Sequence, residues 1–149
     1  MEQKLDEIKI GERMVPLMMS SLEMADIQEE IGCTVGQLRD EVFGIEINFE
    51  TEKEEEQIRF GIVDDGKKIR KFAKLIRIMG NAGLEESGQA PDLTDKWILR
   101  HMKPGMIKAY VVIISAEINK AMQIETGKKQ EGPVDEVLEE ENRKKEPET

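Results

Sequence analysis

The sequence predicts a mostly helical α+β domain, with about five helices and a small antiparallel sheet of two to four strands. Apolar and polar residues alternate in short runs near the N-terminus and before residue 62, as in half-buried strands. Apolar residues recur at helical spacing from residue 69 onwards. Serine and threonine also stand at capping-box spacing before two helical segments. The 149 residues suit one domain, which we expect to span residues 1–126.

The last part of the chain has a different composition. Residues 127–149 contain eight acidic and five basic side chains, and their only aliphatic residues are Val134, Val137 and Leu138. Such a segment buries too little apolar surface to offset the entropy lost on ordering. We therefore expect a polar, disordered C-terminal tail.

The first elements are predicted by alternation and by capping residues. Ile8 and Ile10 alternate with polar residues before a turn at residues 11–12, which predicts a hairpin with Pro16 on an edge strand. Ser20 and Glu23 then predict a capped helix over residues 21–31, which Gly32 ends.

The next segment predicts a short helix and a second hairpin. The short helix begins at Thr34, reaches Phe43 and ends at Gly44. Residues 45–49 and 58–62 alternate as strands, and we expect the glutamate-rich residues 50–57 to connect them as an exposed loop.

The second half predicts three helices. The first follows the turn at residues 64–66 and carries an apolar face over residues 69–79, and we expect the segment Gly80 to Gly83 to end it. A polar loop over residues 84–91 precedes a helix capped by Asp92 or Thr94, which runs through Met102. Residues 104–124 form the most hydrophobic helix, which we expect at the centre of the core.

Charge and cysteine content restrict the partners and the compartment. The net charge of −10 repels phosphate backbones and anionic lipids, which argues against nucleic acid or a membrane surface as the main partner. The longest apolar run, residues 109–114, is far below the ~20 residues that span a bilayer. A lone cysteine, Cys33, and a start without the features of a signal peptide predict a cytoplasmic protein.

The sequence offers no convincing catalytic, cofactor or metal site. His101 is the only histidine, and we expect a solvent-facing ring near a helix end rather than a partner for Cys33, which we expect to be a buried, unreactive thiol. The segment Gly80 to Gly83 follows a helix and lacks the lysine and hydroxyl of a phosphate-binding loop. Residues 64–66 lack the spaced ligands of a calcium loop, and the glutamates of residues 52–56 indicate a solvated charge run.

Two other features bear on partners. Six cations between Lys67 and Arg77 form a basic stripe without interleaved aromatic residues. They favour the protein's own acidic segments, an acidic partner or solvent over nucleic acid. The nine methionines either fill gaps in the core or form an adaptable apolar surface.

The order of these elements resembles that of tail assembly chaperones from long-tailed phages and prophages. The chain is most similar to the type found in prophages of Gram-positive bacteria. The resemblance lies in residues 11–17, in the capped helix before Gly32, and in the run from Leu93 to Met106 before a long helix. It covers roughly residues 8–124.

The resemblance implies a non-enzymatic protein that binds the tape measure protein and assists polymerisation of tail tube subunits around it. It also implies that some members have a longer form made by ribosomal frameshifting. One alternative is another phage structural or adaptor protein, such as a tail connector. The others are a small enzyme using Cys33 or the acidic pairs, and a nucleic-acid-binding regulator using Lys67 to Arg77. A homo-oligomer stays open. The residues we expect to contact the client are Met18, Met19, Met24, Ile27, Met106, Tyr110 and Met122.

Overall fold

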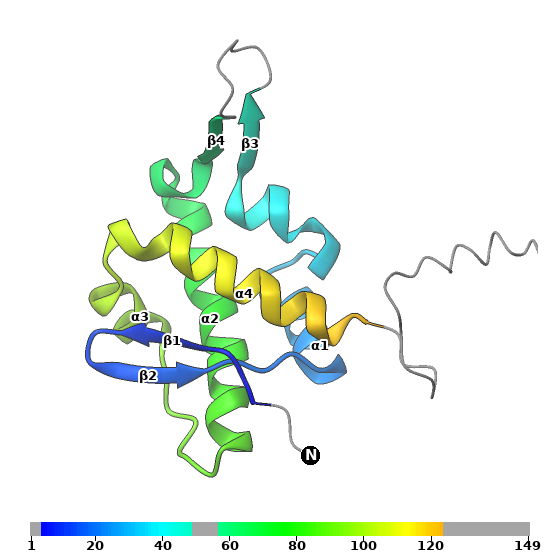
Figure 1. Ribbon diagram of the computed structural model, residues 1–149, viewed down its shortest axis with the longest axis vertical. Helices are drawn as coiled ribbons and strands as arrows, with labels where there is room; N and C mark the ends of the chain where they lie inside the picture. Colours follow the sequence, from blue (N-terminus) through cyan, green and yellow to red (C-terminus); the bar gives the residue numbers. More distant parts are fainter. Residues whose placement is uncertain (1–3, 49–56, 124–149) are drawn as a thin grey trace, which may run out of the picture.

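The computed structural model describes residues 4–48 and 57–123, which form a mostly helical α+β fold with short antiparallel strands (Figure 1). The predicted fold class is therefore confirmed, whereas the predicted tail lies outside the described residues. In chain order the strands and α-helices are β1 (Glu7–Ile10), β2 (Arg13–Pro16), α1 (Ser21–Glu30), β3 (Ile45–Asn48), β4 (Gln57–Phe60), α2 (Gly66–Glu86), α3 (Asp95–His101) and α4 (Ile107–Ala121). Shorter helical segments are the 3-10 turns η1 (Val35–Gln37), η3 (Gly61–Asp64) and η4 (Pro104–Met106) and the π-helix η2 (Arg39–Phe43).

The strands form two separate antiparallel pairs in the described residues rather than one sheet. β1 pairs with β2 around the predicted two-residue turn, where Gly11 has a φ of +64°. β3 pairs with β4, with Ile45 opposite Phe60. Figure 1 shows the second pair projecting from the end of the molecule farthest from the first pair. Most of the predicted glutamate-rich connection lies outside the described residues.

The predicted caps of α1 are present. The Glu23 carboxylate accepts a hydrogen bond from the Ser20 amide at 2.8 Å, and the Ser20 hydroxyl accepts one from the Leu22 amide at 3.3 Å. Gly32 follows the helix with a φ of +88°, a conformation that favours glycine. Local side-chain chemistry thus determines both ends of this helix.

The short helix predicted between Thr34 and Phe43 is irregular. Its start is capped as expected, because the Gln37 side chain accepts a hydrogen bond from the Thr34 amide at 2.8 Å. The segment consists of the 3-10 turn η1 and the π-helix η2, and Gly44 ends it with a φ of +59°. Its location was therefore correct, but its helical type was not predicted.

The predicted end of the central helix is wrong. α2 continues through Gly80 and Gly83 to Glu86, and Leu84, expected in a polar loop, is fully buried. Both glycines face β2 and the segment after it, where a side chain would not fit: a Cβ on Gly80 would lie 2.8 Å from Val15 Cγ1, and one on Gly83 would overlap the carbonyl oxygen of Pro16. These glycines allow two backbones to approach closely and do not terminate a helix.

α2 is the element around which the others pack. It contacts α1, α3, β2 and the π-helix η2, whereas α4 contacts β1 and η4. The prediction that residues 104–124 form the centre of the core holds for one face of α4 only, which includes Tyr110, Val111 and Ile114. Thr94, one of the two predicted caps, begins α3 by accepting a hydrogen bond from the Trp97 amide at 3.1 Å.

Among the described residues, no helix is both long and apolar enough to cross a membrane.

Candidate partner-binding surface

The two candidate nucleophilic residues lie in unrelated surroundings. Cys33 is buried after α1, and burial raises the pKa of its thiol, which the charge of Lys71 only partly opposes. His101 is exposed at the end of α3, where its ring stacks on Trp97 with centroids 4.6 Å apart. The His101 Nδ1 atom also lies 2.8 Å from the carbonyl oxygen of Trp97. Cys33 is thus a buried thiol and His101 a solvent-facing ring near a helix end, as the sequence predicts.

The acidic candidates also have structural roles where the structure describes them. Asp65 caps α2 by accepting hydrogen bonds from the amides of Lys67 and Lys68 at 3.0 and 3.2 Å. Asp64 pairs with Arg59 at 3.1 Å. Residues 4–48 and 57–123 contain no group of three or more histidine, cysteine or carboxylate side chains that could hold a metal ion. The glutamates of residues 52–56 lie outside these ranges.

Half of the basic stripe on α2 is used inside the molecule. Arg77 donates to Asp95 of α3 and to Glu30 of α1, both at 2.6 Å, and Lys74 pairs with Asp95 at 3.2 Å. Lys68 donates to two backbone carbonyls of the π-helix η2 at 3.2 and 3.3 Å. These cations join α2 to its neighbours, and for Lys74 and Arg77 this is the predicted pairing with the protein's own acidic residues.

The ion pairs around Asp95 shift its titration. Burial by itself raises the pKa of the Asp95 carboxyl group, but the hydrogen bonds from Arg77 and Lys74 outweigh it, so the pKa lies below its ordinary value. Burial similarly lowers the pKa of Arg77, and its bonds to Glu30 and Asp95 more than reverse this effect. The cluster therefore stabilises the charged forms of its members.

The predicted client-contact residues are divided between core and surface. Met19, Ile27 and Tyr110 are buried in the core, so they expose little or no surface to a partner. Met18 and Met24 are half-buried. Met106 and Met122 are 42% and 49% exposed, before and after α4. The structure thus does not gather the seven residues on one surface.

A different surface stands out on α4. We define the α4 face as Met106, Ala109, Val112, Ile113 and Ala116, whose spacing places them along one side of the helix. Val112 is 63% exposed, the two alanines are exposed, and Ile113 is half-buried. Between Lys108 and Lys120 the only charged residue is Glu117, which is buried. In a chain with 36% charged residues, this is an unusually apolar exposed helix side.

Sequence reasoning missed most of the α4 face. We singled out methionines and overlooked Val112, although residues 109–114 form the longest apolar run in the chain. A helix that buries only one side and yet has apolar residues all round must expose some of them. Apolar residues all round the helix of residues 104–124 could therefore have predicted an exposed apolar side.

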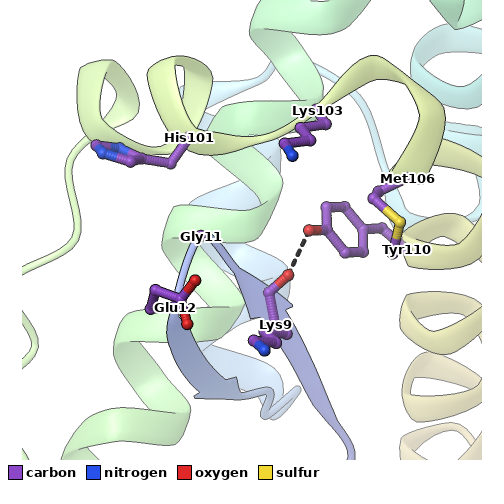
Figure 2. A pocket seen from close by; sticks show the side chains of 7 residues that line it. All are labelled: Lys9, Gly11, Glu12, His101, Lys103, Met106 and Tyr110. Carbon is purple, nitrogen blue, oxygen red and sulfur yellow. Dashed lines mark hydrogen bonds between the residues drawn. The ribbon is translucent and has the colours of Figure 1, made fainter.

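A pocket of about 370 Å³ adjoins the α4 face at Met106. Figure 2 shows the β1–β2 turn on one side of it, and Lys103, Met106 and Tyr110 on the other. The Tyr110 hydroxyl donates a 2.5 Å hydrogen bond to the carbonyl oxygen of Lys9, which joins α4 to β1. We call this the lysine pocket, and its lining residues are Lys9, Gly11, Glu12, His101, Lys103, Met106 and Tyr110.

Comparison of the chain with protein-family models, with curated proteins and with solved structures finds no match.

Proposed function

We propose that this protein is a tail assembly chaperone of a long-tailed phage or prophage, which binds the tape measure protein and assists tail tube assembly without catalysis. The proposal combines the resemblance in element order with the α4 face. In this proposal the protein is a binding module. The tape measure protein is its main partner, and the tail tube protein is reached through it.

The α4 face is the observation that carries the proposal. Exposed apolar patches on a polar protein mark sites that bind other proteins. A helix side without exposed charge between Ala109 and Ala116 suits the apolar stripe of a long helical client, which binds through residues at helical spacing. The net charge of −10 on the rest of the chain keeps such complexes apart by repulsion.

Co-expression with a candidate tape measure protein encoded beside this gene tests the proposal. We expect the chaperone to increase the share of that protein in the soluble fraction. Val112→Glu should remove this effect, because it places a charge on the α4 face at a side chain that is 63% exposed. Leu22→Glu is the matched control, since Leu22 is 65% exposed on a different helix, α1.

Two outcomes would contradict the proposal. A client that is equally insoluble with and without the protein would show that the protein is not its chaperone. Recovery of the protein from purified phage particles would favour a tail connector, because a chaperone leaves the finished particle.

A further inference from the structure

We propose that the lysine pocket binds a carboxylate side chain of the same client helix whose apolar stripe covers the α4 face. The inference rests on the proposed function and deepens it, because it specifies the chemistry of the client segment. That segment would carry an apolar stripe at helical spacing with an acidic residue at the end that reaches Met106.

The lysine pocket and the α4 face form one continuous surface. Met106 begins the α4 face and also lines the pocket, so a helix lying along α4 reaches the pocket with its end. Tyr110 stands at the junction, and its bond to the Lys9 carbonyl fixes β1 beside α4. This bond thus links the pocket to the helix that carries the α4 face.

The pocket is positive in a protein that is strongly negative overall. Lys9 and Lys103 are exposed, and neither makes an ion pair within the part of the chain that the structure describes. Glu12 is the only acidic residue lining the pocket. Exposed lysines beside an apolar surface favour a partner that brings carboxylates to them.

A second copy of this chain fits the surface less well. Lys108 stands beside the start of the α4 face, so two copies in the parallel orientation would place lysine beside lysine. Lys120, in contrast, is already paired with Glu117 and Asp6 at 3.2 and 3.7 Å. Two molecules of net charge −10 also repel each other. An anionic membrane would meet the same repulsion. The charges thus favour a separate protein helix with an acidic end.

Designed peptides test the inference without the natural client. Two helical peptides carry the same leucine stripe and differ only at one end, which has two glutamates in one peptide and two lysines in the other. We expect the glutamate peptide to bind about fivefold more tightly at low salt, measured by fluorescence anisotropy. The difference should vanish at about 1 M salt, where charges are screened beyond about 3 Å.

Paired variants locate the effect. The double variant Lys9→Gln with Lys103→Gln should bind the two peptides equally, because it removes the charges and leaves the Lys9 carbonyl bonded to Tyr110. The matched control, Lys67→Gln with Lys96→Gln, loses two exposed lysines elsewhere and should keep the preference. Val112→Glu should weaken both peptides.

Each contrary result has a separate meaning. Equal binding of both peptides by the unchanged protein, binding of neither, or a preference that survives the pocket variant would overturn the inference. Binding to phosphatidylglycerol vesicles in place of the peptides would overturn it in favour of a lipid surface. Failure to keep the tape measure protein in solution would instead contradict the proposed function. The preference for the glutamate peptide would still test whether the lysine pocket binds carboxylates.

Discussion

Gly83 is the position where one methyl group should do the most damage. It lies on the buried side of α2, and a Cβ there would overlap the carbonyl oxygen of Pro16 and lie 2.5 Å from its carbonyl carbon and 3.0 Å from the Leu17 amide nitrogen. All three are backbone atoms, so no side-chain rotation relieves the overlap. Gly83→Ala must push the segment after β2 away from α2.

The expected cost follows from three effects. Alanine favours a helix interior over glycine by about 1 kcal/mol, which opposes the damage. Overpacking against rigid atoms costs about 3 kcal/mol, and separating the two elements strains the 3.1 Å hydrogen bond from the Met18 amide to the Met79 carbonyl, at about 1 kcal/mol. The free energy of unfolding should fall by about 3 kcal/mol, which lowers Tm by roughly 6 to 12 °C.

Thermal and urea unfolding followed by circular dichroism measure this change against two matched variants. Gly66→Ala adds a methyl group in open space at the first residue of α2, and should keep or slightly raise the free energy of unfolding. Gly80→Ala meets only the side chains of Leu93 and Val15, which can shift, so it should cost about 1 kcal/mol. A Gly83→Ala protein as stable as Gly66→Ala would refute the close-approach argument.

Three further predictions concern single side chains. Asp95→Asn should lower the free energy of unfolding by about 1 to 2 kcal/mol at pH 7, since it breaks the charged bonds to α2. Because the folded protein lowers the pKa of Asp95, its contribution is fully present above the ordinary aspartate pKa and is lost as pH falls through the lowered pKa, so the difference between wild type and variant in urea titrations should shrink with increasing acidity. Convergence at high pH instead would contradict this assignment. Tyr110→Phe should cost about 1 kcal/mol in the same assay by leaving the Lys9 carbonyl without its donor, and an unchanged midpoint would show that this bond contributes nothing. Cys33 should react with a disulfide reagent at least about tenfold more slowly in the folded protein than in urea, since it is buried with a raised thiol pKa, and equal rates would show that the site opens readily.

Local chemistry made much of the fold predictable. Several predicted features depend only on residues close by in the sequence. They are the capping pair of Ser20 and Glu23, the left-handed backbone of Gly32 and Gly44, and the turn at Gly11. Their hydrogen bonds and backbone angles depend on neighbours along the chain, so the sequence is enough to place them. The same holds for the alternation of β1, which follows directly from burial on one side.

The candidate site was less predictable, because exposure depends on packing. The sequence showed that residues 104–124 are apolar, but it did not show which side would be covered. Tyr110 and Val112 are both apolar positions of one helix, yet the first is buried against β1 and the second is largely exposed. The lysine pocket unites residues about a hundred positions apart, such as Lys9 and Lys103, which no local pattern connects.

The sequence by itself determined the fold class, the caps and turns, the apolar side of α2 and the acidic balance of −10, because each depends on composition or on short-range spacing. Only the tertiary structure decided that α2 continues past Gly80, that the strands form two separate pairs, and that half of the basic stripe joins helices together. It also decided which side of α4 is left apolar and exposed. These features arise from contacts between distant segments, where the space available to a side chain outweighs its intrinsic preference.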